Sequence, residues 1–267
     1  MTQCPKCSHV RMPHETQVHP DICPACGISY SKWQMRHRGT SPAAQKTVSD
    51  AIDAEDDAAE VHDAEYAERN WWTYCKDTFT EVPVRIEPAV WWGRAGVWCL
   101  LLAWAMYFAS HGVDWEIIGG SFLHNINLAF HEFGHVFFAP FGRLMMILGG
   151  SLFQLLLPLG LLFAFTFYQR ENFGAAVMLW WCGQSFVDLA PYIRDAEYRS
   201  LPLVGGAGEE SHDWGNIMTE FDAIGSAVAL GNASFTVGCV LMLLGLMWGG
   251  YILWLQHLVM RGEIVFE

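Results

Sequence analysis

Long apolar stretches constrain the fold of this chain more than any other feature. From Trp91 onward about five apolar runs alternate with polar segments. Each run is close to the roughly 20 residues that cross a bilayer as a helix. The runs lie near 91–109, 117–141, 144–168, 173–193 and 226–256. Hydrophobic residues make up 52% of the chain, which is high for a soluble domain. The sequence therefore predicts an α-helical polytopic membrane protein with about five transmembrane helices and a membrane core over 91–258.

The charged residues divide the rest of the chain. The net charge of −13 is concentrated before Trp91 and in the long polar segment before the last apolar run. Segment 39–70 is rich in alanine and acidic residues, which predicts a solvated linker. Segment 71–90 combines tryptophan pairs with basic residues and is typical of the membrane interface. We expect no signal peptide, because no apolar run follows the first residues.

Basic residues in the polar segments predict the orientation. Lys and Arg are more numerous on the side that would carry the N-terminus, and such residues favour the cytoplasmic face. We therefore expect an integral protein of the bacterial inner membrane, with its N-terminus in the cytoplasm.

Four cysteines mark the N-terminal segment 1–38. Cys4 and Cys7 form one CxxC pair, and Cys23 and Cys26 form a second. Two such pairs at this spacing are typical of a structural zinc site with four thiolate ligands. Disulfides are the alternative, which a reducing cytoplasm disfavours. We predict a small zinc ribbon. Binding a protein partner is one function of such a unit. The segment lacks interleaved aromatic and basic residues, so the pattern does not favour nucleic-acid binding.

The second apolar run contains the sequence "HEFGH". In a helix, His131 and His135 share one face and can bind one metal ion, while Glu132 can accept a proton from a metal-bound water. Ionisable groups at membrane depth cost several kcal/mol and are tolerated when they have partners or a function. This context favours a metal site, although two histidines hydrogen-bonded inside a helix bundle are the simpler alternative.

A third protein ligand must come from elsewhere in the chain. The candidates near the membrane are Asp188, Asp195, His212, Asp213 and His124. At about 1.5 Å per residue, His131 and Asp188 lie at nearly equal depth on their predicted helices, which favours Asp188. His212 is the second choice, since its loop can fold back to the cytoplasmic side. The simpler reading is that His212 and Asp213 cap a helix that begins near Trp214.

Further polar residues share the faces of these helices. Gln184, Asp188, Tyr192 and Asp195 form one stripe, and Asn127 precedes His131 by one turn. Such a stripe faces a bundle interior. These side chains can orient a ligand or bind a substrate carbonyl, although hydrogen bonding between helices is the alternative for each.

The HExxH motif in an apolar helix, followed by an Asp in a later helix, resembles the site-2 protease family of intramembrane zinc metalloproteases. The resemblance implies zinc held by His131, His135 and Asp188, with Glu132 as the general base. It departs from the family at Asp188, which stands in "FVDLAPYIRDAE" without a following Gly. The resemblance implies hydrolysis of peptide bonds in membrane-anchored substrates, with one catalytic and one structural zinc.

Two non-enzymatic alternatives use the same residues. A membrane zinc sensor or transporter would use the two histidines and the aspartate but would leave Glu132 without a role. A membrane scaffold would depend on the zinc ribbon alone. Replacing Glu132 separates these alternatives from a protease.

Overall fold

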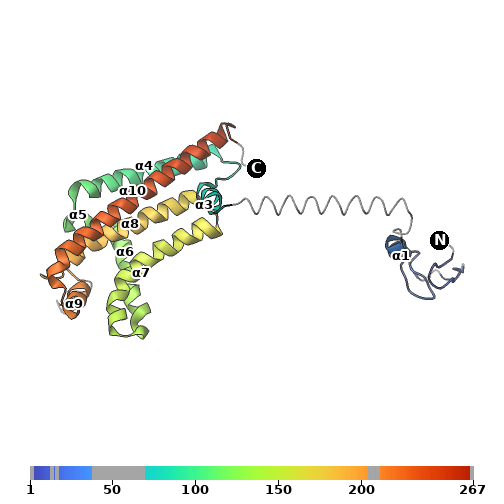
Figure 1. The fold of residues 1–267 in the computed structure, drawn as a ribbon, viewed down its shortest axis with the longest axis horizontal. Coiled ribbons are helices and arrows are strands. Elements are labelled where there is room, and N and C mark those ends of the chain that lie inside the picture. Colours follow the sequence, from blue (N-terminus) through green and yellow to red (C-terminus); the bar gives the residue numbers. More distant parts are fainter. Residues whose placement is uncertain are drawn as a thin grey trace. The chain divides into compact units, whose positions relative to one another are not determined.

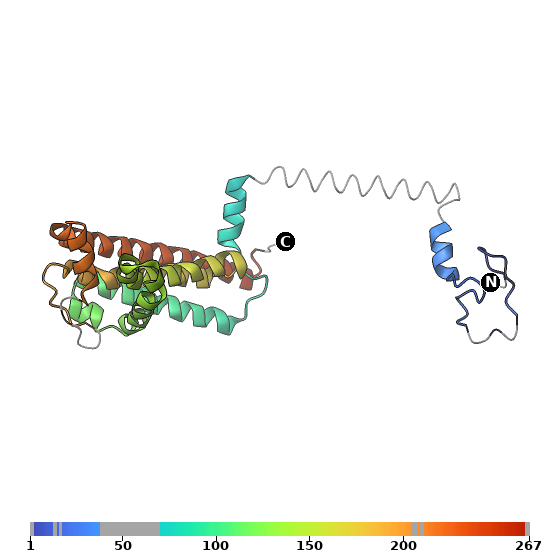
Figure 2. The same ribbon diagram turned by 90° about the horizontal axis from the view of Figure 1, so that it is seen from below.

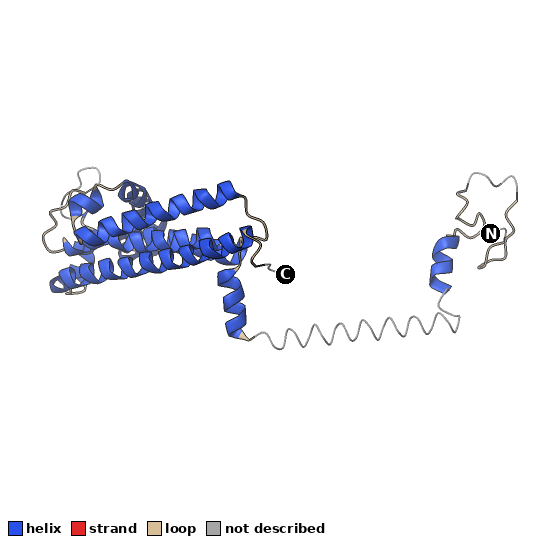
Figure 3. Ribbon diagram, turned by 90° about the horizontal axis from the view of Figure 1, so that it is seen from above, coloured by secondary structure: helices blue, strands red, loops and turns tan. Residues whose placement is uncertain are grey.

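The computed structural model describes residues 3–12, 15, 18–37, 70–203, 208 and 211–264. The chain divides into two compact units, Met1–Trp72 and Thr73–Glu267. The predicted acidic linker, 39–70, lies outside the described residues except for Asn70. In the described parts of both units the regular structure is helical, and no β-strand is formed (Figure 3).

The first unit contains two short turns followed by the helix α1 (Tyr30–His37). Each turn carries one CxxC pair and is closed by an isolated bridge, Gln3 with Val10 and Ile22 with Ser29. Gly27 has a φ of 71°, a left-handed conformation that glycine adopts without steric cost. The buried centre of the unit consists of Cys4, Cys23 and Tyr30.

The second unit is a bundle of helices. Its α-helices are α4 (Pro88–His111), α5 (Trp115–Gly119), α6 (Phe122–Phe138), α7 (Arg143–Phe163), α8 (Asn172–Arg194), α9 (Asp213–Glu220) and α10 (Ala227–Met260), preceded by α3 (Trp71–Thr80), which begins two residues before the unit boundary. Short irregular helices extend them: η2 (Ala139–Phe141), η3 (Ala164–Tyr168) and η6 (Ile224–Ser226). The helices α4, α8 and α10 run side by side along one direction (Figures 1 and 2).

Three helical segments are long and apolar enough to cross a membrane: Pro88–His111, Arg143–Tyr168 and Ile224–Met260. These segments correspond to the first, third and fifth predicted spans. The other two predicted spans form helices of a different character. The helix α6 has 17 residues, at the lower limit for a crossing helix. The helix α8 has 23 residues and buries polar side chains among its apolar ones. The count of five spans therefore stays a prediction.

Small residues allow α10 to approach α8 closely. Gly231, Gly238 and Gly245 recur at seven-residue intervals on α10. A Cβ atom added at Gly238 would lie 2.5 Å from the carbonyl oxygen of Gly183 on α8. A Cβ atom at Gly245 would lie 2.8 Å from the carbonyl oxygen of Ala176. This stripe gives α8 and α10 the most extensive helix contact in the unit, as small residues do between membrane helices.

Tryptophans of α4 fasten this helix to α10. The indole nitrogen of Trp98 donates to the carbonyl oxygen of Leu246 at 2.8 Å, and that of Trp91 donates to Leu253 at 3.0 Å. Trp180 of α8 packs with Phe108 of α4 and Met242 of α10 in the main apolar cluster. The helix α10 thereby packs against both α8 and α4.

Side-chain caps fix where the helices begin. Asp114 accepts hydrogen bonds from the first turn of α5, Ser121 from α6 and Glu171 from α8. Such caps satisfy amide groups that have no partner within the helix. The helices α5 and α9 lie at one end of α8, and α3 lies at its other end (Figure 1). The cap at Ser121 sets the start of the helix that carries the HExxH motif.

Candidate metal centres

The four cysteines of the first unit come together as the sequence predicts. Their sulfur atoms lie within 4.8 Å of one another. Two pairs, Cys4 with Cys26 and Cys7 with Cys23, are 3.7 Å apart. Four thiolates at 2.3 Å from a central zinc ion would be separated by about 3.8 Å. A disulfide needs about 2.05 Å. The four cysteines can therefore hold a metal ion such as zinc, and all four are free thiols.

Backbone amides favour the ionised form of one ligand. Burial raises the pKa of Cys23, but the amides of Cys26 and Ala25 and neighbouring thiols outweigh burial and lower the pKa to about 6. A thiol must lose its proton to bind a metal ion. The turn is thus arranged to present a thiolate near neutral pH.

The second candidate centre lies on α6. One helical turn separates His131 from His135, and their ring centroids are 4.9 Å apart. The carboxylate oxygen Oδ2 of Asp213 lies 3.1 Å from Nε2 of His131 and 3.2 Å from Nε2 of His135. Ligands at 2.0–2.2 Å in a tetrahedron are about 3.3–3.6 Å apart. The two histidine–aspartate separations are therefore close to those that one zinc ion requires, and one ligand atom from each of the three residues lies within 4.8 Å of the others.

The other ring nitrogens of the two histidines face oxygen atoms. Nδ1 of His135 lies 2.8 Å from the carbonyl oxygen of Met146, and Nδ1 of His131 lies 3.2 Å from Oε1 of Gln154. A carbonyl oxygen only accepts, so His135 carries its proton on Nδ1 when neutral. The Nε2 lone pair of neutral His135 then faces the Asp213 carboxylate. Two acceptors that face each other repel, and a cation between them would relieve this repulsion. Hydrogen bonds to the second ring nitrogen are typical of metal-ligating histidines.

Space for an ion lies next to Gly150 of α7. A Cβ atom added at this glycine would be 2.5 Å from Nε2 of His131 and 2.6 Å from Nε2 of His135. The absence of a side chain keeps the region between the two ligand nitrogens clear. The donor set and this space together fit a zinc ion.

Asp213 reaches the histidines because it is the first residue of α9. The side chain of His212 caps this helix by accepting from the amide of Gly215 at 3.0 Å. The hydroxyl group of Tyr192 accepts from the Asp213 amide at 2.9 Å and donates to its carboxylate at 3.2 Å. The indole of Trp214 donates to the hydroxyl of Ser151 at 3.1 Å and ties α9 to α7. The predicted helix start near Trp214 is therefore present, and it also positions a ligand.

The surroundings keep Asp213 ionised. Burial raises the pKa of Asp213, but hydrogen bonds from the Nε2–H groups of protonated His131 and His135 and the positive charge of these rings outweigh burial and lower the pKa to about 2. A metal ion would take the place of these Nε2 protons. A carboxylate ligand must be ionised, so this side chain is ready to bind a metal ion at neutral pH.

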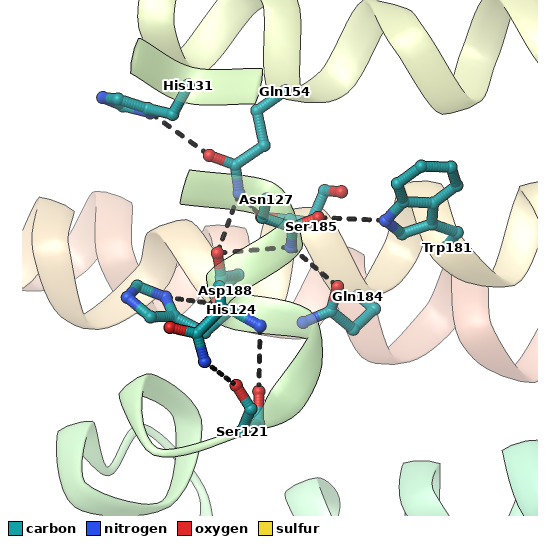
Figure 4. A network of polar contacts seen from close by, with 10 residues as sticks. Ser121, His124, Asn127, His131, Gln154, Trp181, Gln184, Ser185 and Asp188 are labelled. Atoms are coloured by element: carbon teal, nitrogen blue, oxygen red, sulfur yellow. Dashed lines mark hydrogen bonds and ion pairs between the residues drawn. The ribbon is translucent and has the colours of Figure 1, made fainter. Parts of the chain in front are cut away.

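Asp188, the predicted third ligand, lies elsewhere. Its Oδ1 is 3.0 Å from Nδ1 of His124, and its Oδ2 accepts from Asn127 at 3.2 Å and from Gln154 at 3.0 Å (Figure 4). Asp188 is buried in this network, with Gln154 between it and His131. Equal depth on two helices was the basis of the prediction, and depth does not specify which group a side chain faces. The carboxylate that joins the two histidines is that of Asp213.

His212 and Asp195, the alternative candidates for the third ligand, also form contacts with other residues. Nδ1 of His212 serves as the helix cap, and its Nε2 lies 3.4 Å from Oδ2 of Asp195. Burial lowers the pKa of His212. Asp195 accepts from the hydroxyl of Ser200 at 2.6 Å and from the amide of Leu201 at 2.8 Å. Both residues support the segment that leads to α9 rather than the histidine pair.

The other predicted polar residues fall into two groups. Tyr192 contacts the ligand Asp213 directly. Asn127 lies beyond Asp188, where it donates to Gln184 Oε1 at 2.8 Å and accepts from the indole of Trp181 at 2.9 Å. Asn127 and Gln184 are almost fully buried, as groups that join helices are.

A cavity of about 720 Å³ lies beside the histidine pair. Glu132 lines it, and its side chain is exposed. The apolar part of the lining includes Leu128, Met146, Ile147, Leu189, Leu201 and Leu203. This volume is in the range of ligand-binding sites. The cavity therefore brings an exposed carboxylate, two imidazoles and an apolar surface together.

Comparison with known proteins adds no relative to this picture. No protein family, curated protein or solved structure matches this chain, so its function is argued from its own residues.

Proposed function

We propose that this chain is a zinc-dependent endopeptidase that cleaves membrane-anchored proteins. The observation that carries the proposal is the convergence of His131, His135 and Asp213, beside Glu132 and an apolar cavity. Three protein ligands leave a position open for water or substrate, as in catalytic rather than structural zinc sites. Nδ1 of both histidines faces an acceptor, which supports neutral Nε2 ligands.

Zinc bound at this centre would supply Lewis acidity, polarising the scissile carbonyl and lowering the pKa of water. Glu132 acts as the general base, taking a proton from the attacking water and delivering it to the leaving amine. Its position next to His131 in the helix and its exposure to the cavity support this role. Asp213, His131 and His135 would hold the ion.

The substrate is an apolar segment in an extended conformation. A helix hides its carbonyl groups in internal hydrogen bonds, so a transmembrane substrate must unwind before hydrolysis. Leucine, isoleucine and methionine side chains of the cavity suit the apolar residues of such a segment. The three helices that are long and apolar enough to cross a membrane support a location in the bilayer, where such substrates are anchored.

The N-terminal unit carries a structural zinc ion and serves as a docking module for a protein partner. Its four thiols form a closed ligand set with no position for substrate. We propose that it lies in the cytoplasm and that the core lies in the bacterial inner membrane, as the distribution of Lys and Arg favours.

The central experiment replaces the general base and leaves the ligands intact. The full chain is reconstituted in vesicles with single-span reporter proteins, and both cleavage and zinc content are measured. Glu132→Gln should keep zinc at both centres and lose cleavage by at least about 100-fold. Glu197→Gln, a change of an exposed carboxylate outside the cavity lining, is the matched control.

Cleavage by Glu132→Gln at the wild-type rate would refute the general base. A wild-type chain that holds zinc at both centres and cleaves none of the reporters would favour a zinc sensor or transporter. A wild-type chain that holds zinc only in the cysteine site would remove the basis of the protease.

A further inference from the structure

The two histidines of the candidate centre are held by different kinds of acceptor. His135 faces the backbone carbonyl of Met146, which can only accept a hydrogen bond. His131 faces the side-chain amide of Gln154, which can present either its oxygen or its nitrogen. If Gln154 presented its nitrogen, Nδ1 of His131 would have to accept, and the proton would move to Nε2. A proton on Nε2 would occupy the lone pair that a metal ion needs.

Asp188 determines which end of the Gln154 amide faces His131. The Gln154 nitrogen Nε2 lies 3.0 Å from Oδ2 of Asp188 and 3.4 Å from the carbonyl oxygen of Ser185 (Figure 4). Both of these partners are acceptors, so the nitrogen of Gln154 must lie on their side. The oxygen of Gln154 is thereby turned towards Nδ1 of His131, at 3.2 Å.

Asp188 is itself held in place from the opposite side. Asn127 donates to its Oδ2, and the indole of Trp181 fixes the orientation of Asn127 by donating to its oxygen. His124 contacts Oδ1 at 3.0 Å. Asp188 is 5% exposed and Gln154 is 3% exposed, so little of either side chain is open to water. A buried carboxylate is costly without such partners.

We propose that Asp188 and Gln154 are positioning residues that set the tautomer of His131. Asp188 orients the Gln154 amide, Gln154 holds the proton of His131 on Nδ1, and Nε2 is left free to bind the metal ion. This inference rests on the metal centre of the proposed function. It gives Asp188 a role through two hydrogen bonds, in place of the direct ligation that the sequence predicts.

The first variant removes the amide. Gln154→Met keeps a side chain of similar size and eliminates both hydrogen bonds. Zinc affinity at the His131–His135 centre should fall about 10–100-fold, the usual effect of losing a partner of a ligating histidine. Affinity is measured on the full chain by chelator competition, with the cysteine site as an internal reference. Gln256→Met is the matched control, because Gln256 is also fully buried but its side chain makes no hydrogen bond to the residues that the structure describes.

The second pair of variants separates orientation from ligation. Asp188→Asn keeps an oxygen that can accept from Gln154, so zinc affinity should stay within a few-fold of wild type. Asp188→Leu removes the acceptor and should lower the zinc affinity as much as Gln154→Met does. The ¹⁵N chemical shifts of His131 in the zinc-free chain report the tautomer directly. Because Nε2 of His131 lies 3.1 Å from the Asp213 carboxylate, it can also hold a proton in the zinc-free chain, so the diagnostic atom is Nδ1. We expect Nδ1 to carry a proton in wild type and Asp188→Asn, and to lose it in part of the Asp188→Leu chains.

Each outcome bears on the inference. A folded Gln154→Met chain with wild-type zinc affinity and an unchanged His131 spectrum would overturn the positioning role alone. If Asp188→Asn lost zinc as completely as His131→Ala, the positioning role would be overturned and Asp188 would be a direct ligand. A wild-type chain with zinc only at the cysteines would overturn the metal centre and the positioning role together.

Discussion

The two candidate metal centres of this chain are built in opposite ways. The cysteine site takes four ligands from two CxxC turns, and its paired sulfurs are separated by 22 and 16 residues in the sequence. The histidine centre takes its ligands from two helices, with His131 and Asp213 separated by 82 residues. The first is closed by four protein ligands, whereas the second has three ligands and a cavity beside them. A closed local site suits stability, and an open site assembled between helices suits chemistry.

Removing a cysteine should give the largest effect and should separate the two units. Cys23→Ala leaves three ligands in a unit whose buried centre is made of Cys4, Cys23 and Tyr30. Zinc binding contributes about 10 kcal/mol to the folding of such small units, so we expect the first unit to unfold. Limited proteolysis should cut within the first unit and spare the helical core. Cys99→Ser, an exposed cysteine of α4, is the control. Joint loss of both zinc ions would show that the two sites are coupled.

Removing the ligand carboxylate tests the open centre. Asp213→Ala should weaken zinc binding there by more than the 10–100-fold expected of an indirect partner, because a direct ligand is lost. The cysteine site should keep its zinc, which elemental analysis of the purified full chain measures. Asp222→Asn changes an exposed aspartate two residues after α9 and serves as the control, because asparagine tolerates the left-handed φ of 52° at this position. An unchanged zinc content in Asp213→Ala would exclude this residue as the third ligand.

Filling the space beside the histidines should also expel the ion. In Gly150→Ala the new methyl group would lie 2.5–2.6 Å from both Nε2 atoms, so we expect loss of zinc from this centre. Alanine is favoured over glycine in a helix by up to about 1 kcal/mol, and the fold should therefore persist. Gly160→Ala on the same helix meets nothing within 4 Å and should keep zinc. Equal zinc affinities in the two variants would refute the placement of the ion.

The smallest expected effect concerns pH. Burial lowers the pKa of His212 below its ordinary value near 6.5. The unfolded chain then binds the proton first as the pH falls, so the contribution of His212 to stability is complete above pH 6.5 and declines below it. With saturating zinc, the melting temperature should fall by at most a few degrees between pH 7 and pH 5. His212→Asn keeps a residue that can cap α9 and should reduce this slope. An identical slope in both chains would contradict the prediction.

The sequence predicts local features of this chain well. The cysteine cluster, the pairing of His131 with His135 on α6 and the helix start at His212 follow from short-range spacing. Helix character in the membrane core follows from the apolar runs. The choice of Asp213 as the carboxylate beside the histidines did not follow, although the sequence "SHDWGN" offered both His212 and Asp213 as candidates. The position of Asp213 depends on how the segment after α8 folds back, which Tyr192 and Trp214 fix through contacts with distant residues.

The position of Asp213 after α8 determines when the centre can exist during synthesis. The ligands of the cysteine site are all present once the first 26 residues have been made. The histidine centre lacks its carboxylate until the ribosome has passed the fourth predicted span and begun α9. Local contacts form quickly, whereas contacts between distant segments wait for the chain and for closure of the intervening loop. A nascent chain therefore completes the cysteine cluster long before it completes the cluster of His131, His135 and Asp213. For the protease proposed above, this order would delay cleavage of neighbouring membrane proteins until α9 has been made.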